Sequence, residues 1–468
     1  MKYSFYHITD HHYFSKKNYD GDPWALPQWN DQIAMRESEE ILKKALGMIL
    51  KDSETHTVIF TGDMTHHGDK ESHEELTALL DSFESEGGNV FAFTDSHDYP
   101  DEMPVFRFGK DGKPYEKEHM EKEEVLPLYK KYGVNKALAV YCEGESFVAE
   151  IFPGLRCIAL CYEKSKNGFY FSEDYKQWLK NQALSAEKEG AVMIGGIHPP
   201  IIAPNPVYSA ISRENVFENG KKVGAELAEM GINLVFSGHC HMHGIQCSES
   251  KDGKPFYDVS TASLVGCPPK MRRITVDTEL KTAEITTILM DLPELNLGMS
   301  LEQYCRKGFL GSLEVIPYNM EHDVKAFAET GGGISLPKEK IMKHKRIVSG
   351  AGKFLNNFTF GKAEKIARLG NGLKKIECSS VKDKKVVPFV FDIICNIYSG
   401  DSYISPKSAE YQITSGVVSV IDGVIKILPV DFKKLTGFGT LKEIVEPLLF
   451  NKGIDHNNAV LNLKDLSV

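Results

Sequence analysis

Residues of the types that bind metal ions occur in five short blocks, each directly after an apolar run of the sequence. The blocks are Asp10-His11-His12, Gly62-Asp63, Asp95-Ser96-His97-Asp98, His198 and Gly238-His239-Cys240-His241. A mixture of carboxylates and imidazoles suits divalent Mn, Fe or Zn. Two such ions about 4 Å apart can clamp a phosphoryl group during displacement at phosphorus. The residue types therefore indicate hydrolytic chemistry at a metal centre.

The spacing inside two of the blocks favours chelation of one ion by two side chains. Asp10 and His12 are alternate residues that leave a strand, and so are His239 and His241. Alternate residues of an extended chain point to the same side. The same rule favours His12 over His11 as a ligand.

Asp63 and the two glycines of these blocks suit a compact site. A carboxylate such as Asp63 can bridge two cations with its two oxygens. Gly62 and Gly238 relax the limits on the backbone and permit a tight turn beneath the ions. Cys240 lies between two candidate ligands, and its side chain should point the other way.

The elements that must position these blocks alternate between strands and helices. Of the 16 histidines, 13 precede residue 244, which places the chemistry in the first half of the chain. The apolar patterns predict strands over 3–9, 57–61, 89–94, 191–197 and 232–237, and helices over 37–50, 71–84 and 220–230. In open α/β sheets, ligands bind outside the carboxyl ends of the strands, so distant blocks can converge on one site.

Other segments predict the remaining strands and a second domain. A hairpin is expected from 147–151 and 156–160, and closing strands of a second sheet from 256–260, 273–276 and 283–289. Beyond residue 292 the pattern changes: 301–310 and 338–366 are largely helical, and 417–430 and 441–450 mix apolar runs with turns. We expect one domain over residues 1–291 and a smaller, mainly helical accessory domain over 292–468. The second domain could cap the cleft, set substrate choice or mediate dimerisation.

The composition argues against several classes of partner. The formal charge is −10, which does not favour tight binding to nucleic acid or to an anionic membrane. The N-terminal segment lacks the features of a signal peptide, and the most apolar stretch, 386–398, is too short for a membrane span. The nine cysteines include no C-x-x-C pair, so we expect reduced thiols and a cytoplasmic location. The basic cluster 343–346 is interpreted as a solvated helix face.

In this order, the five blocks resemble the calcineurin-like metallophosphoesterase superfamily. Its pattern is D-x-H, then G-D, G-N-H-[DE], H and G-H-x-H, and the match covers roughly residues 1–290. The resemblance implies an α/β fold in which two sheets form a sandwich flanked by helices, in α-β-β-α layers. It also implies an enzyme that hydrolyses a phosphodiester or a phosphomonoester with two divalent ions (Mn, Fe or Zn).

The resemblance also implies a role for each matching residue. The first ion would be held by Asp10, His12 and His241, the second by His198 and His239, and both by the bridging Asp63. A hydroxide bridging the two ions would be the nucleophile. His97 would steady the leaving oxygen or donate a proton to it, and Asp98 could orient His97. The flanking His66, His67 and His243 are expected on the rim of the site or in solvent.

One block departs from the family pattern. Asp95-Ser96 stands where the family has Gly-Asn, and that Asn ligates the second metal. Ser96 is a shorter and poorer ligand, so either Ser96 itself, Asp95 or an extra water would complete the second site. The alternative reading is a catalytically weakened protein that binds metal or a ligand on the same fold.

A longer segment around Asp63 bears on the substrate. Residues 62–75 are similar to the class III cyclic-nucleotide phosphodiesterase branch, which carries G-D-x-T-x-x-G. The resemblance implies a small-molecule phosphate ester as the substrate, with a cyclic nucleotide as one candidate. We expect no nucleic-acid or membrane partner, and a homodimer is one candidate assembly.

Overall fold

Two β-sheets packed face to face form the larger part of the molecule. This computed structural model of the chain describes residues 1–21, 32–95, 97–100, 105–111, 113–211, 213–329, 338–401, 404–427, 431–450 and 453–464. Within these residues the two large sheets have six and seven strands. Two small two-stranded ribbons accompany them: β4 (Val105–Phe108) with β5 (Pro114–Lys117), and β9 (Glu163–Ser165) with β10 (Gly168–Tyr170).

The first sheet has the strand order β17-β16-β15-β1-β2-β3. Its strands are β1 (Lys2–Ile8), β2 (Thr57–Thr61), β3 (Asn89–Phe93), β15 (Lys270–Asp277), β16 (Thr282–Leu289) and β17 (Ala459–Asn462). β1, β2 and β3 are parallel, whereas β1 pairs antiparallel with β15. The carboxyl ends of the three parallel strands therefore meet at one edge of the sheet.

The second sheet has the strand order β13-β14-β12-β11-β8-β7-β6. Its strands are β6 (Ala137–Tyr141), β7 (Ser146–Phe152), β8 (Leu155–Ala159), β11 (Val192–Gly196), β12 (Ile232–Ser237), β13 (Gly244–Glu249) and β14 (Pro255–Ser260). β8, β11, β12 and β14 run parallel, and β7 and β8 form the predicted hairpin. This sheet delivers the later blocks of candidate ligands.

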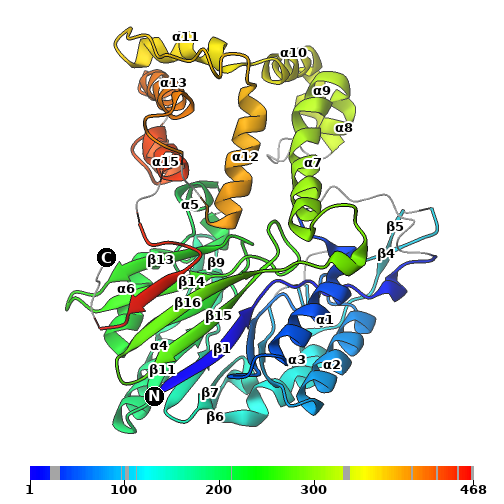
Figure 1. Ribbon diagram of the computed structural model, residues 1–468, viewed down its shortest axis with the longest axis vertical. Coiled ribbons are helices and arrows are strands. Elements are labelled where there is room, and N and C mark those ends of the chain that lie inside the picture. The colour runs from blue at the N-terminus through cyan, green and yellow to red at the C-terminus, as the bar shows by residue number, and fades with distance from the viewer. Residues whose placement is uncertain are drawn as a thin grey trace.

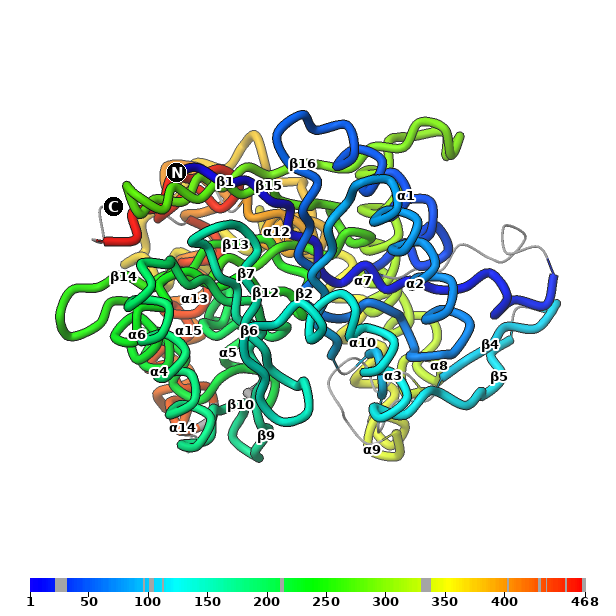
Figure 2. The backbone as a smooth tube through the Cα atoms, turned by 90° about the horizontal axis from the view of Figure 1, so that it is seen from below, coloured from blue at the N-terminus to red at the C-terminus, as the bar shows by residue number. Residues whose placement is uncertain are grey.

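The layers follow from which faces are apolar. Phe5 and Ile59 of the first sheet meet Ile194 and Phe236 of the second in a core between the sheets. The outer faces are covered by α1 (Ser38–Ile49) and α2 (Lys70–Ser85) on one side, and by α4 (Glu173–Lys188) and α6 (Gly220–Met230) on the other. Figure 2 shows these helix pairs on opposite sides of the molecule. The α-β-β-α sandwich predicted from the sequence is confirmed.

The assignment of the closing strands to one second sheet was wrong. β14 lies in the seven-stranded sheet beside β12, whereas β15 and β16 belong to the six-stranded sheet beside β1. All three segments share the same apolar, β-branched character. Sheet membership instead depends on pairing between segments far apart in the sequence, as for Phe5 with Ile274.

The part of the chain after residue 292 is mainly helical, as expected. Its described helices are α7 (Leu301–His322), α8 (Val324–Glu329), α9 (Lys338–Lys343), α10 (Lys345–Asn356), α11 (Phe360–Gly370), α12 (Val386–Ser399), α13 (Ala409–Ile425), α14 (Phe432–Thr436) and α15 (Leu441–Leu449). α7 and α12 rise from the sandwich, α10 and α11 lie at the far end, and α13 and α15 lead back towards the sandwich (Figure 1). The short α3 (Lys122–Tyr129) and α5 (Pro206–Ile211) precede this region.

Two features of this helical region differ from the sequence pattern. Residues 417–425, expected to mix apolar runs with turns, continue α13, because packing against α11 and α15 outweighs the low helix propensity of their Val and Ile residues. β17 returns to pair with β16 in the first sheet. Among the described helices, none has both the length and the apolar character needed to cross a bilayer.

Candidate metal centre

The candidate ligands converge because each follows a strand whose carboxyl end faces the same edge. Asp10 follows β1 and Asp63 follows β2 in the first sheet. His198 and His239 follow β11 and β12 in the second. The first sheet thus delivers both carboxylates together with His12, and the second sheet delivers His198, His239 and His241. Asp63 is 1% exposed and His198 3% exposed, so the groups meet in a largely desolvated place.

One cluster gathers four of the candidate ligands. The ligand atoms of Asp10, His12, Asp63 and His241 all lie within 4.8 Å of one another. The Nε2 atoms of His12 and His241 are 2.9 Å apart. His241 Nε2 is 3.3 Å from Asp10 Oδ1, and His12 Nε2 is 3.9 Å from Asp63 Oδ2. This grouping is the one that the resemblance implies for the first ion.

A second cluster shares one carboxylate with the first. The ligand atoms of Asp63, His198 and His239 also lie within 4.8 Å of one another. His198 Nε2 is 3.1 Å from Asp63 Oδ2. Because Asp63 belongs to both clusters, it stands where a carboxylate bridging two ions would have to stand.

The His198 ring tests whether these residues fit a cation. Its Nδ1 donates to the carbonyl of Thr61 at 2.8 Å, which turns Nε2 towards Asp63. Nε2 is buried and has no hydrogen-bond partner among the described residues. The neutral ring would aim a lone pair at a carboxylate, which is unfavourable unless a proton or a metal ion lies between the two atoms. The donor set therefore fits divalent cations.

The charges in the centre point the same way. Burial alone would lower the pKa of His198, but Asp63 and two other carboxylates raise it well above its usual value. Burial alone would raise the pKa of Asp63, and yet the imidazoles of His198 and His97 hold it well below its usual value. The carboxylates are thus ionised and attract positive charge. Metal ions can supply that charge in place of protons.

The backbone is turned into the left-handed region at most of the ligands. Positive φ angles occur at Asp10 (49°), His12 (42°), Asp63 (46°), His239 (70°) and His241 (54°). This region costs an L-residue roughly 1 kcal/mol or more. Five such residues at one place indicate that the surrounding structure imposes the geometry of the site.

Two glycines let the ligands approach the neighbouring strands. A Cβ at Gly62, whose φ is +94°, would lie 2.5 Å from Nδ1 of His198. A Cβ at Gly238 would lie 2.3 Å from Oδ2 of Asp10. Gly62 is therefore required both for the tight turn, as expected, and for the close approach of His198. Gly238 is required only because a side chain there would collide with Asp10.

Hydrogen bonds hold the Asp10 carboxylate in place. Its oxygens accept the backbone N–H of His239 at 2.9 and 3.0 Å, and Oδ2 also accepts from the Thr9 hydroxyl at 2.8 Å. Ser263 donates to the carbonyl of Asp10 at 2.6 Å. The first and last ligand blocks are thereby tied together across the sandwich.

His97 lies beside both clusters with one nitrogen committed. Its Nδ1 donates to the carbonyl of His66 at 3.0 Å, and its Nε2 is 3.9 Å from Asp63 Oδ2. Burial alone would lower the pKa of His97, but Asp63 raises it above its usual value. The side chain is 29% exposed, so Nε2 can carry a proton at an accessible place.

Asp98 is placed differently from the sequence expectation. Its Oδ1 accepts from the backbone N–H and the hydroxyl of Thr65 at 2.8 and 3.1 Å, and its Oδ2 accepts from the N–H of Asp95 at 2.9 Å. The ring of His97 is held by a backbone carbonyl instead. Burial raises the pKa of Asp98 to about 7. Asp98 fastens the loop that carries His97 and does not hydrogen-bond to the ring.

Residues 3–243 match the sequence model of the calcineurin-like phosphoesterase family. The chain belongs to this family. Family membership implies a dinuclear centre of divalent metal ions, and the two clusters sharing Asp63 are the candidate ligands.

Solved structures also resemble the chain, at low sequence identity. A dimetal phosphatase from Danio rerio is 13% identical, with a TM-score of 0.41, and the match covers 61% of this chain and 95% of that one. A purple acid phosphatase from yellow lupin is 11% identical, with a TM-score of 0.36, over 62% of this chain and 52% of that one. A predicted phosphoesterase from Streptococcus pneumoniae is 9% identical, with a TM-score of 0.24, over 62% and 90%. No curated protein gives a match.

Of the two residues that depart from the family pattern, the structure describes Asp95. Ser96 lies outside the described residues. The carboxylate of Asp95 accepts the hydroxyl of Tyr162 at 2.8 and 3.0 Å, and Asp95 is in none of the clusters found among the described residues. Asp95 is therefore engaged at the wall of the site.

His11 and His243, which lie in or next to the family blocks, are not part of the metal centre. His11 is fully buried, and its ring centroid is 5.3 Å from that of Phe60, whereas His12 joins the first cluster. His243, expected on the rim, is 2% exposed and bonds to Thr287 Oγ1 at 2.7 Å, so that expectation was wrong.

His66 and Cys240, which lie near the clusters, differ in whether they join a group of possible ligands. His66 forms a third group with His12 and His97, whose ligand atoms also lie within 4.8 Å of one another. Cys240 donates to the carbonyl of Gly238 at 3.4 Å and is in none of the groups among the described residues, in keeping with its expected direction.

A cleft of about 680 Å³ opens beside the second cluster. His97, His198 and His239 form its metal-side wall. The rest of the lining includes the aromatic residues Tyr99, Tyr162 and Phe169 and the cations Lys122, Lys130 and Lys164. None of these six residues was predicted from the sequence. Tyr99 directly follows the block that ends at Asp98, and the other five come from segments that carry no ligand block.

Proposed function

We propose that the chain hydrolyses a small-molecule phosphate ester at a two-metal centre. The observation that carries this proposal is that one buried carboxylate, Asp63, belongs to both ligand clusters, and that His198 and His239 also line the cleft. A phosphoryl group bound between the clusters would therefore have its organic part in the cleft. When bound, two divalent ions would polarise the phosphoryl oxygens and lower the pKa of a water molecule.

The assignment of ligands follows from the clusters. We assign Asp10, His12 and His241 to the first ion, His198 and His239 to the second, and Asp63 to both. Asp95 or Ser96 would complete the second site. Mn, Fe and Zn all suit this set of nitrogen and oxygen donors.

His97 is the candidate proton donor. Since its Nδ1 is held by the carbonyl of His66, only Nε2 is free to exchange a proton with a substrate. As the P–O bond breaks, the proton on Nε2 passes to the leaving oxygen. General acid catalysis of this kind typically contributes about 10²- to 10⁴-fold to the rate.

The cleft favours an anionic substrate with a planar group. Lys122, Lys130 and Lys164 supply positive charge, and Tyr162 and Phe169 supply aromatic faces. A phosphodiester or phosphomonoester with a ring in its organic part satisfies both features, and a cyclic nucleotide is one candidate. Residues 1–291 together with β17 would form the catalytic domain, and the helices between residues 292 and 458 the accessory domain.

Asp63→Asn tests the proposal. Hydrolysis of bis-(p-nitrophenyl) phosphate and of p-nitrophenyl phosphate is measured with added Mn, and metal content is assayed on the same samples. The variant should lose at least about a hundredfold in turnover, because the shared ligand is weakened. Asp174→Asn, an exposed carboxylate on α4, is the matched control.

The two possible failures have different meanings. Near-normal turnover in Asp63→Asn would refute the assignment of the centre. Two ions bound by the native chain without turnover of either ester would favour the alternative, a metal- or ligand-binding protein. The ratio of the two rates separates a diesterase from a monoesterase.

A further inference from the structure

Positive charge is concentrated at one end of this acidic chain. Residues 338–385, here called the basic edge, contain fourteen Lys or Arg and four Asp or Glu, a formal charge of +10. The whole chain carries −10, so the remainder carries −20. Thirteen of the fourteen cationic residues are exposed. The acidic average that argues against anionic partners therefore does not describe this part of the surface.

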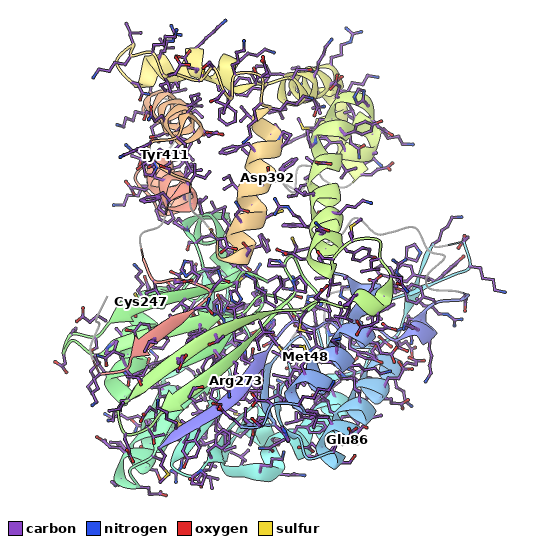
Figure 3. The ribbon with its side chains drawn as sticks, viewed as in Figure 1. Met48, Glu86, Cys247, Arg273, Asp392 and Tyr411 are labelled. Carbon is purple, nitrogen blue, oxygen red and sulfur yellow. The ribbon has the colours of Figure 1, made fainter. Side chains whose placement is uncertain are left out.

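The basic edge lies far from the metal centre. α10 and α11 run along the end of the molecule opposite the sandwich (Figure 1), and Figure 3 shows side chains projecting outward from them. α12 connects this end with the sandwich, where the carbonyl of Ser399 accepts from Lys270 of β15. A helix of this length spans about 20 Å. That exceeds the Debye length of about 8–10 Å at physiological salt, so the acidic sandwich scarcely weakens the field at this edge.

Large apolar side chains are exposed among these cations on α10. Ile347 is 71% exposed and Phe354 56% exposed, and they lie two turns apart on one face. The opposite face packs on α7, where a Cβ at Gly352 would meet the backbone at 2.5 Å. Arg346 and Lys353 precede the two apolar residues and flank the same face. α10 is thus amphipathic, with its outward face both apolar and cationic.

The next helix repeats this arrangement. Gly370 on the inner face of α11 packs on α13, since a Cβ there would lie 2.3 Å from the carbonyl of Gly416. Lys362 and Lys365 are exposed on the outer face, with Leu369 67% exposed. Leu373, 73% exposed, follows in the turn. The combination of aliphatic side chains and lysines therefore extends over two elements.

We propose that the basic edge docks on the surface of a bilayer that contains anionic lipid. Cationic residues would meet the lipid headgroups, while the exposed Ile, Phe and Leu side chains enter the boundary with the acyl chains. A nucleic acid would use the cations but would leave the aliphatic side chains in water. Docking at this end would also hold the acidic sandwich away from the negative surface.

Sedimentation of the full chain with vesicles tests this proposal. The chain should bind vesicles of phosphatidylcholine with phosphatidylserine, bind pure phosphatidylcholine weakly, and be released by salt. The double substitution Arg346→Glu with Lys353→Glu should weaken binding roughly tenfold or more, because each cation near such a surface contributes about fivefold. Ile347→Ser with Phe354→Ser should also weaken binding.

The control carries the same charge change on the sandwich. Lys180→Glu with Lys188→Glu alters exposed lysines of α4 and should leave binding nearly unchanged. The proposal is overturned if both charge variants lose binding equally, or if the native chain ignores anionic vesicles. Binding to duplex DNA but not to vesicles would also overturn it, in favour of a nucleic-acid partner. Circular dichroism confirms that each variant is folded.

Discussion

The substitution Gly238→Ala should damage the metal centre through a single methyl group. A Cβ at this position would lie 2.1 Å from Thr9 Oγ1 and 2.3 Å from Asp10 Oδ2. Both distances are more than about 1 Å shorter than ordinary van der Waals contact. Gly238 itself cannot move away easily, because its backbone N–H donates to the carbonyl of His198 at 2.8 Å within the second sheet. The Asp10 carboxylate must therefore move.

The expected magnitude follows from what the Asp10 carboxylate would lose. It accepts the N–H of His239 at 2.9 Å and the hydroxyl of Thr9 at 2.8 Å. Hydrogen bonds to a charged group contribute about 1.5–3 kcal/mol each, and overpacking adds about 1–3 kcal/mol. Partial relaxation reduces the total, so we expect destabilisation of about 2–4 kcal/mol. Loss of the hydrogen bonds that orient a metal ligand typically lowers metal affinity 10- to 100-fold.

Calorimetric titration with Mn and urea unfolding of the metal-free chain would measure the two effects separately. Gly47→Ala is the matched control, because Gly47 lies in α1 and a Cβ there meets nothing within 4 Å. That variant should bind metal normally and gain about 0.5–1 kcal/mol in stability. Native metal affinity in Gly238→Ala would refute the argument that the contact with Asp10 controls the site, whatever the change in stability.

Two further predictions concern proton transfer and pH. His97→Asn should lower turnover of an alkyl phosphate ester by about 10²- to 10⁴-fold with unchanged metal content, and equal turnover would exclude His97 as the proton donor. Burial raises the pKa of Asp258 to about 6, although Ser237 Oγ and the N–H of Ile202 bond to it. Between about pH 4 and 6 the folded chain still holds a proton on Asp258 that the unfolded chain has already released. The stabilisation of the folded state by this proton is therefore lost as the pH rises through 6. The difference in unfolding free energy between the native chain and Asp258→Asn should fall by on the order of 2 kcal/mol over that range and stay constant above pH 7; a difference independent of pH would contradict the raised pKa.

The positions of the candidate ligands along the fold were predictable because the signals are local. A buried strand needs a run of apolar residues, and the polar residue that ends the run marks the carboxyl end. Strands over 57–61 and 232–237 were predicted with the bounds that the structure shows. Parallel strands in one sheet place such ends side by side. Asp63 and His239 could therefore be assigned to one site from these runs alone.

The support of the site could not be predicted, because it depends on contacts between distant segments. Nothing near Asp98 in the sequence indicates that the N–H and the hydroxyl of Thr65 will donate hydrogen bonds to its carboxylate. His239, His241 and His243 occupy alternate positions in the sequence. His239 and His241 join the ligand clusters, yet His243 turns towards β16 and away from the cleft. Sheet membership of β14 and β15 was likewise decided by their partners. In each case many side chains satisfy the local pattern, and packing selects among them.

The distribution of charge over the surface was likewise not predictable from the sequence composition. The formal charge of −10 combines an acidic body with a basic edge of opposite sign, and it describes neither. The short cluster 343–346 looked like an ordinary solvated helix face when it was considered alone. Only the fold brings it together with Lys362 and Lys365 of α11 on one outer edge, because α10 and α11 both pack their inner faces on the other helices. The physical quantity that a partner experiences is the field over a distance of about one Debye length. A charge sum informs about partners only when it is taken over a surface of that size.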